Sequence, residues 1–193
     1  MKQLVFVTNN PHKLKEAQSI ISGDFKIISL AEIGCEEEIA ETGDTIEANA
    51  SQKAFYVYNK YKVNCFADDT GLEIEALGGH PGVYSARWAG EDCSFENNIK
   101  KALEELHDST NRKACFRTIV SLIIDGKETQ FEGRVDGQIL REKHGISGFG
   151  YDPIFQPNGY QQSFAEMHPD EKNLISHRGQ AMQKLMEYLR GIK

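Results

Sequence analysis

The sequence predicts a mixed α/β fold, and three observations support this prediction. Short apolar runs rich in β-branched residues alternate with helical patterns through the first part of the chain. A long β-prone stretch in the middle contains an Asp-Gly pair, which is typical of a hairpin. An amphipathic helical pattern closes the sequence. We therefore expect parallel strands early, antiparallel strands in the middle, and a single domain over residues 1–193.

The first elements follow from an apolar run and a polar turn. Residues 4–7 form a continuous apolar run, as expected of a strand that is buried on both faces of a parallel sheet. Asn10 is a good N-cap and Pro11 a good first residue for the helix that follows. Residues 26–30 then have the composition of a second strand.

The next elements surround a polar sequence with two aspartates. A helix is expected over residues 45–61, with Asp44 as its cap. The apolar run 63–67 predicts a strand that ends at the polar sequence 68–71, and residues 72–76 predict a further strand.

The remaining elements are a helix, a hairpin and a glycine-rich loop. Ser94 begins a helix that extends to about residue 106. Residues 114–124 and 128–140 predict a long antiparallel pair joined at Asp125-Gly126. A glycine-rich loop over 144–153 precedes the final helix.

Composition and charge exclude several classes of protein. The chain has 22 Lys and Arg against 29 Asp and Glu, a formal net charge of −7. This balance argues against general affinity for nucleic acid or anionic membranes, since both attract basic surfaces. The four cysteines form no C-x-x-C pair, which disfavours a zinc or thioredoxin-like site. The apolar stretch at the N-terminus is too short for a signal peptide, so we expect a cytoplasmic protein with reduced thiols.

The turn from Thr8 to Lys13 is the first candidate site. A helix that begins directly after a strand presents free N–H groups and a partial positive charge, which suits a phosphate. Lys13 lies in the first turn, where the helix dipole disfavours a cation unless an anion is bound. An ordinary strand–helix turn with solvated lysines has the same pattern, so both interpretations stay open.

Two acidic sequences are candidates for metal binding or proton transfer. Asp68 and Asp69, placed at the expected strand end, suit a Mg²⁺ site or a general base, although Asp-rich turns are also common. Glu41 stands beside a glycine in an acidic stretch, which is either a solvated face or a metal ligand. Lys53, in the following helix, is placed to serve a second phosphate.

The last candidates lie in the second half of the chain. The loop over 145–153 combines three glycines and two aromatics, as a loop against a planar ligand or a structural loop would. If the final helix includes Leu174, Arg178 shares its apolar stripe and needs a carboxylate partner. If Ser176 is instead the N-cap, His177 and Arg178 lie in the first turn of that helix.

Together these segments resemble the inosine triphosphate pyrophosphatase family. The matching sequences are TNNPHK, AETGDTIEANASQKA, ADDTGLEIEALGGHPGVYSARWAG, GFGYDPIF and EKNLISHRGQA, which run in order from residue 8 to residue 181. The resemblance implies an elongated, two-lobed mixed sheet flanked by helices, with an active-site cleft between the lobes. It also implies a homodimer and Mg²⁺-dependent cleavage of dITP, ITP or XTP to the nucleoside monophosphate and pyrophosphate.

The resemblance also assigns roles to individual residues. Glu41 and Asp69 match positions that bind metal, and Asp69 also matches the general base. The positions that match the phosphate side are Thr8, Asn9, Asn10, His12, Lys13, Lys53 and Thr70. Those that match the nucleoside side are Phe149, Gly150, Tyr151, Asp152, Lys172, His177 and Arg178. Asn9 and the pair Pro11-His12 stand where relatives often have small residues.

Purine chemistry is consistent with these roles. Donors from His177 and Arg178 would pair with the 6-oxo group of hypoxanthine or xanthine, whereas the 6-amino group of adenine would face them with another donor. Phe149 would stack on the purine. Two other interpretations remain: a nucleotide sensor without turnover, and a phosphatase that removes phosphates one at a time.

Overall fold

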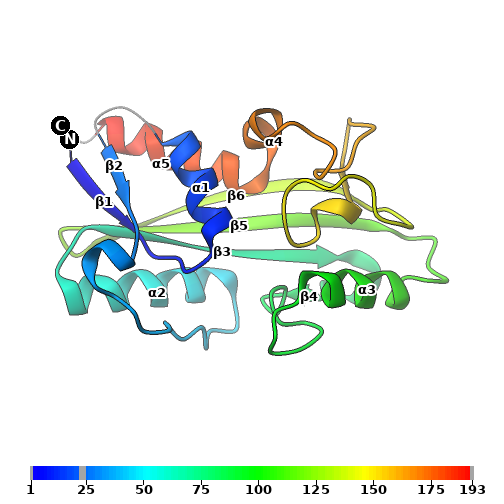
Figure 1. Ribbon diagram of the computed structural model, residues 1–193, viewed down its shortest axis with the longest axis horizontal. Coiled ribbons are helices and arrows are strands. Elements are labelled where there is room, and N and C mark those ends of the chain that lie inside the picture. The colour runs from blue at the N-terminus through cyan, green and yellow to red at the C-terminus, as the bar shows by residue number, and fades with distance from the viewer. Residues whose placement is uncertain (1, 22–24, 192–193) are drawn as a thin grey trace. The chain divides into compact units, whose positions relative to one another are not determined.

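The computed structural model describes residues 2–21 and 25–191, and its helices and strands alternate largely as the sequence predicts (Figure 1). The strands are β1 (Lys2–Phe6), β2 (Phe25–Ile28), β3 (Cys65–Ile74), β4 (Pro81–Gly82), β5 (Lys113–Ile124), β6 (Lys127–Ile139) and β7 (Phe155–Pro157). The α-helices are α1 (Pro11–Ile20), α2 (Ile46–Tyr61), α3 (Phe95–Glu105), α4 (Pro169–Ile175) and α5 (His177–Gly191).

Strand pairing confirms the expected change from parallel to antiparallel. β1 is parallel to both β2 and β3, whereas β4 pairs antiparallel to β3 and β7 antiparallel to β6. The strand order is β2-β1-β3-β5-β6-β7. Between β5 and β6, Asp125 and Gly126 have φ angles of 50° and 81°. A two-residue hairpin turn requires such positive angles, so the Asp-Gly pair forms the predicted turn.

By internal contacts the chain divides into two compact units. The first comprises Met1–Asp69, Thr118–Gly133 and Arg178–Lys193, and the second comprises Thr70–Arg117 and Arg134–His177. Strands β3, β5 and β6 each contribute one part to either unit. Two neighbouring pairs of predicted site residues, Asp69 with Thr70 and His177 with Arg178, are therefore divided between the units.

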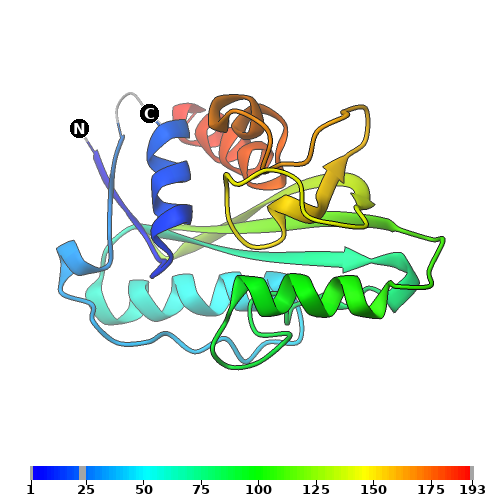
Figure 2. The ribbon, with the colours of Figure 1, turned by 45° about the vertical axis from the view of Figure 1, so that its right-hand side comes forward.

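The first unit has helices on both faces of its part of the sheet. Leu4 and Phe6 of β1 belong to a core cluster with residues of α1 and α5, whereas Val5 and Val7 belong to a cluster with residues of α2. Figures 1 and 2 show α2 on one face of this sheet and α1 with α5 on the other. Both faces of β1 are covered from Leu4 onward, which explains why residues 4–7 are continuously apolar instead of alternating.

The second unit is built around aromatic side chains. Phe116 of β5 and Phe155 of β7 lie with ring centroids 4.7 Å apart, and Phe155 and Phe164 lie 5.2 Å apart. Ile99 and Ala102 of α3 are buried in the same cluster. This core supports the loop 144–153, which carries several of the predicted site residues.

One expectation is wrong in a way that matters for the site. Residues 63–67 and 72–76 do not form separate strands, because β3 runs without a break from Cys65 to Ile74. Asp68 and Asp69 therefore lie within a strand and not at a strand end. Aspartate is a poor strand former. Here the side chain of Asp68 is held by ion pairs from other elements, which the local sequence does not reveal.

The helix caps follow local sequence with one exception. Asn10, Pro11 and Ser94 occupy the predicted positions at the starts of α1 and α3. The cap of α2 is Thr45 and not Asp44, because the Thr45 hydroxyl accepts a hydrogen bond from the Ala48 N–H at 3.1 Å. The helix thus begins one residue later than expected.

The C-terminal helical region is two helices separated at Ser176. Ser176 has φ −69° and ψ 157°, which is extended backbone, so α4 ends at Ile175 and α5 begins at His177. Of the two arrangements considered, the one that places His177 and Arg178 in the first turn of the last helix is confirmed. Leu174 is 68% exposed and does not belong to the apolar stripe formed by Ala181, Leu185 and Leu189.

Two further observations concern the described part of the chain as a whole. No helix within residues 2–21 and 25–191 combines the length and apolar character needed to cross a membrane. All four cysteines have free thiols; Cys35, Cys65 and Cys115 are buried and Cys93 is exposed.

Candidate active site

The turn into α1 presents the positive end of a helix. Asn10 Oδ1 accepts hydrogen bonds from the N–H groups of His12 at 2.9 Å and Lys13 at 3.3 Å. The Thr8 hydroxyl in turn accepts one from the Asn10 N–H at 3.1 Å. The first turn contains no acidic residue. The helix dipole and the Lys13 ammonium therefore both favour an anion near this turn.

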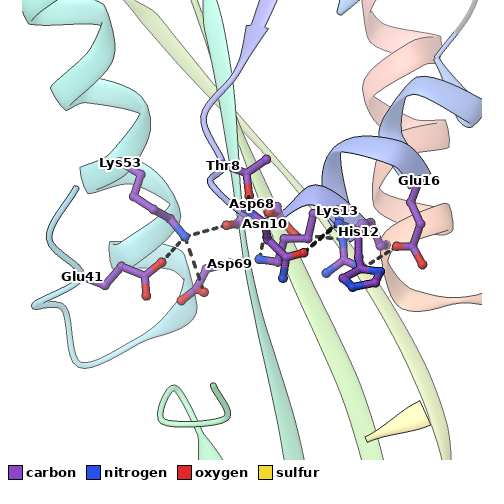
Figure 3. Close-up of polar contacts among 10 residues, drawn as sticks. Thr8, Asn10, His12, Lys13, Glu16, Glu41, Lys53, Asp68 and Asp69 are labelled. Carbon is purple, nitrogen blue, oxygen red and sulfur yellow. Dashed lines mark hydrogen bonds and ion pairs between the residues drawn. The ribbon is translucent and has the colours of Figure 1, made fainter. Parts of the chain in front are cut away.

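Asp68 lies at the centre of the charged residues of the first unit (Figure 3). Its side chain is fully buried, and its two oxygens accept from Lys13 Nζ and from Arg178 Nε, each at 3.0 Å. Burial alone would raise the pKa of Asp68, but the positive charges of Lys13 and Arg178 outweigh it and lower that pKa. Asp68 is thus ionised at neutral pH and holds two cations, one from α1 and one from α5.

Arg178 has a second carboxylate partner within the same unit. Its Nη1 donates to Glu16 Oε2 at 2.7 Å, and Glu16 lies on α1, one turn after Lys13. The Arg178 side chain is almost completely buried. Burial opposes its charge, but Asp68 and Glu16 raise the pKa of Arg178. The structure thereby provides the internal carboxylate partners that a buried guanidinium requires.

Lys53 of α2 lies between the two acidic residues predicted to bind metal (Figure 3). Its Nζ donates to a Glu41 carboxylate oxygen and, at 2.7 Å, to the Asp68 carbonyl oxygen, and it lies 3.7 Å from Asp69 Oδ1. Burial raises the pKa of the Asp69 carboxyl, although the Lys53 charge opposes this. For Lys53, burial would lower the pKa, but Asp69 and Glu41 raise it overall. The three groups form one charged cluster in which Lys53 and Asp69 are buried and Glu41 is partly exposed.

Side chains of α2 hold the loop that carries Glu41. Asn49 Oδ1 accepts from the Gly43 N–H at 2.7 Å, and Gln52 Oε1 accepts from the Thr42 N–H at 3.0 Å. A Cβ on Gly43 would lie 2.7 Å from the Ala48 Cβ, so a larger residue could not approach the helix as closely. The glycine after Glu41-Thr42 thus has a packing reason, and the loop fixes where Glu41 lies.

The donor set around Lys53 fits a magnesium ion that is held jointly with a substrate. Within the described residues no three His, Cys, Asp or Glu side chains gather so that they could hold a metal ion by themselves. Glu41 and Asp69 provide two carboxylates, which are the hard oxygen donors that Mg²⁺ prefers. Magnesium commonly takes one or two protein carboxylates and completes its octahedron with waters and substrate phosphates. The observed pair matches that pattern.

The second unit holds the predicted nucleoside-side residues around another buried ion pair. Asp152 Oδ2 accepts from Lys172 Nζ at 2.7 Å and from the Phe149 N–H at 2.8 Å. The Lys172 ammonium lies 5.1 Å from the centre of the Phe149 ring. A Cβ on Gly148, whose φ is 76°, would lie only 2.2 Å from Asp152 Oδ2. Asp152 and Lys172 therefore fix the backbone and the ring of Phe149.

Among the other predicted residues of this unit, Tyr151 and His177 are buried, whereas Thr70 and Gly150 are partly exposed. The Tyr151 hydroxyl donates to the Ser85 carbonyl oxygen at 2.9 Å, and burial raises the pKa of that phenol. The His177 ring is buried and stacks on Phe116 with centroids 4.5 Å apart. Gly150 has a φ of 60°, and Thr70, on β3, is partly buried. In the first unit, by contrast, Asn9 and His12 are exposed.

Several residues of the site could not be chosen from sequence alone. Asp68 belongs to the Asp-Asp pair, but the resemblance assigns a role only to its neighbour Asp69, and no sequence signal says that Asp68 lies between cations. Glu16 follows Lys13 by three residues, the spacing of a helix face, yet nothing local links it to Arg178. Asn49 and Gln52 lie within a sequence that matches the family, but nothing local says that their side chains hold the backbone of the Glu41 loop.

The fold and the site together define a class of protein. It is a mixed α/β protein in which a positive helix end, the largely buried ammonium groups of Lys13 and Lys53, and the carboxylates of Glu41 and Asp69 lie within one unit. The chain belongs to the Ham1 family, whose model matches residues 4–188.

Relatives and solved structures agree with this assignment. The chain is 53% identical over 187 residues to a dITP/XTP pyrophosphatase of Christiangramia forsetii, covering 97% of this chain and 98% of that protein. It is 47% identical to a dITP/XTP pyrophosphatase of Bacillus subtilis, covering 98% of each chain. The Ham1 protein of Staphylococcus aureus has a similar structure, with a TM-score of 0.90 and 38% identity over the whole of both chains.

Proposed function

We propose that this protein hydrolyses non-standard purine nucleoside triphosphates, namely dITP, ITP, XTP and dXTP, to the nucleoside monophosphate and pyrophosphate. Relatives named dITP/XTP pyrophosphatase align with nearly the whole chain. The observation that carries the proposal is the grouping of Lys13 and Lys53 with the carboxylates of Glu41 and Asp69 in one unit (Figure 3). Triphosphate hydrolysis needs both cations and acidic oxygens of this kind.

The triphosphate binds to the positive groups of the first unit. The amino end of α1, with its hydroxyl and amide side chains from Thr8 to Asn10, provides N–H donors for phosphate oxygens. Lys13 and Lys53 provide local positive charge in a chain whose formal net charge is −7. Because both ammonium groups are largely buried, their attraction to a phosphate is less screened than at an exposed site.

Asp69 acts as the general base. A water molecule must attack the α-phosphorus on the side opposite the pyrophosphate, and a carboxylate near it can orient the water and accept its proton. Burial raises the pKa of Asp69, which makes its carboxylate a stronger base than an exposed aspartate. No covalent intermediate is required.

Glu41 and Asp69 would hold the Mg²⁺ ion that the resemblance implies. When bound, the ion would neutralise phosphate oxygens and stabilise charge that develops in the transition state. Asn49 and Gln52 maintain Glu41 in place through the backbone of its loop. The protein thus positions the two carboxylates through α2, which holds the loop of Glu41, and through β3, which carries Asp69.

We assign purine recognition to Phe149 and His177 of the second unit, and the resemblance also places Arg178, which belongs to the first unit, among the nucleoside-side residues. Phe149, held by Asp152 and Lys172, offers a ring face for stacking. His177 and Arg178 donate to the 6-oxo group, so adenine, with its 6-amino group, would leave donors facing donors. This mismatch is the physical basis for rejecting ATP. The resemblance also leads us to propose a cytoplasmic location and a homodimer. Light scattering on the purified protein would test the homodimer.

Product analysis tests the proposed function directly. The protein is incubated with Mg²⁺ and, separately, with ITP, XTP, dITP, ATP and GTP, and the products are separated by ion exchange. Pyrophosphate and a monophosphate from ITP and XTP are the expected result. Orthophosphate released stepwise would identify a phosphatase, and binding of ITP without turnover would identify a sensor; either outcome contradicts the proposal.

A further inference from the structure

Lys53 occupies the position between the two carboxylates that are proposed to hold magnesium. Its side chain is largely buried, at 9% exposure. Its ammonium contacts Glu41 and the Asp68 carbonyl oxygen directly and lies within ion-pair distance of Asp69. An ammonium has three N–H donors, and these neighbours lie on a loop and on β3, whereas Lys53 itself lies on α2. The lysine therefore joins three elements through one charge.

In this arrangement the Lys53 ammonium lies beside the two carboxylates that a divalent metal ion would have to bind. Two positive groups that share the same two carboxylates repel each other strongly in a site of low polarity. With Lys53 in place, Glu41 and Asp69 carry a net charge of only about −1 to attract a divalent ion, by counting formal charges. A lysine, however, is a point charge on a flexible four-carbon chain and can move to another anion.

We propose that Lys53 is an internal counter-ion that closes the Glu41–Asp69 pair to divalent metal until a triphosphate draws its ammonium away. This inference rests on the proposed function, because it needs a polyanionic substrate. Magnesium then enters together with the nucleotide and not before it. The exchange breaks no covalent bond. The Lys53 ammonium moves from the carboxylates of Glu41 and Asp69 to phosphate oxygens, and the two carboxylates would then be available to bind the metal.

The same contacts explain why the chain keeps two carboxylates close together without a metal. Like charges within a buried site are costly unless a cation compensates them. Lys53 provides that compensation, and its pairing also holds the loop of Glu41 against β3. A resident ammonium thus maintains the geometry of the metal ligands until the metal arrives.

Metal binding by the protein without nucleotide tests this role. Mn²⁺, which accepts the same oxygen ligands as Mg²⁺, is titrated into the wild type and into Lys53→Met, Lys53→Gln and Lys53→Arg, and bound ion is followed by electron paramagnetic resonance. Lys60→Met is the matched control, because Lys60 lies on the same helix but pairs with Glu37 at the surface. Melting curves with and without Mg²⁺ are recorded for each protein.

The expected result is a clear division between the variants. Lys53→Met and Lys53→Gln should bind Mn²⁺ roughly tenfold to a hundredfold more tightly than the wild type, the order expected when a nearby like charge is removed. They should also be stabilised by Mg²⁺ alone. The Lys53→Arg and Lys60→Met variants should behave like the wild type. A merely structural lysine would change the melting temperature without this gain in metal affinity.

Two results would overturn the proposal. One is tight, stoichiometric Mn²⁺ binding by the wild type without nucleotide. This measurement does not depend on whether any variant folds. The other is equal or weaker Mn²⁺ binding by folded Lys53→Met or Lys53→Gln. Either can occur while ITP is still converted to pyrophosphate, so the failure of this inference is distinguishable from failure of the proposed function.

Discussion

Removing the charge of Asp68 should destabilise the first unit more than any loss of an exposed ion pair. Asp68→Asn keeps the shape of the side chain but leaves Lys13 and Arg178, both paired to it at 3.0 Å, without their shared anion. Breaking a buried pair typically costs about 3–5 kcal/mol, because a buried charge remains uncompensated. For a chain of this size each kcal/mol shifts the melting temperature by roughly 2–4 °C. We expect a decrease of roughly 6–20 °C from these two relations.

Urea and thermal unfolding would measure this loss, with Asp136→Asn as control. Asp136 pairs with Arg134 at 2.7 Å, but both side chains are about half exposed, so its loss should cost about 0–1 kcal/mol. The pKa of Asp68 is lowered in the folded state, so its stabilisation is complete above the unfolded pKa and is lost as pH falls through the folded one. The difference between wild type and Asp68→Asn should therefore shrink in acid. A cost below about 1 kcal/mol at neutral pH would refute the reasoning.

Three further predictions concern the reaction. Asp69→Asn should keep the melting temperature within a few degrees and lower the turnover of ITP by a factor of roughly 10²–10⁴. Activity of this variant within a few-fold of wild type would contradict the assignment of Asp69 as general base. Because burial raises the Asp69 pKa, the activity of the wild type should begin to fall in acid at a pH above the ordinary aspartate pKa. Glu41→Gln should require more Mg²⁺ for half-maximal rate, and an unchanged titration would exclude Glu41 as a ligand. Arg178→Ala should lower kcat/KM for ITP by a factor that corresponds to roughly 2–4 kcal/mol of transition-state stabilisation, and kcat/KM for ATP far less. Equal proportional losses with earlier melting would identify Arg178 as the structural partner of Asp68 and Glu16 only.

The Arg178 experiment bears on a tension within the structure. Arg178 matches a base-recognition position, yet it donates to two carboxylates of its own unit. Glu16→Gln separates the two roles, because it removes one ion pair and leaves the guanidinium intact. If recognition depends on how Arg178 is held, Glu16→Gln should change the ratio of ITP to ATP turnover. If Arg178 is only structural, this variant should lower stability and leave the ratio unchanged.

Local chemistry in the sequence determined much of the fold. The cap at Asn10 with Pro11, the cap at Ser94 and the turn at Asp125-Gly126 each depend on a few neighbouring residues, and all are observed. Even here a single hydroxyl decided the start of α2, since Thr45 and Asp44 are both acceptable caps. The family motifs likewise selected Glu41, Lys53 and Asp69, which the structure brings together.

Tertiary structure decided what joins residues that are far apart in the chain. Arg178 meets Asp68 across 110 positions and Glu16 across 162, and no local pattern encodes such pairs. The order β2-β1-β3 places the segments after β1 and within β3 side by side, so Lys13 reaches Asp68. Propensity predicted that the strand would end at the aspartates, but buried cations from α1 and α5 compensate Asp68 and allow β3 to continue. The sequence by itself named the chemical groups, whereas burial and ion pairing, which depend on long-range contacts, decided which aspartate holds the cations together.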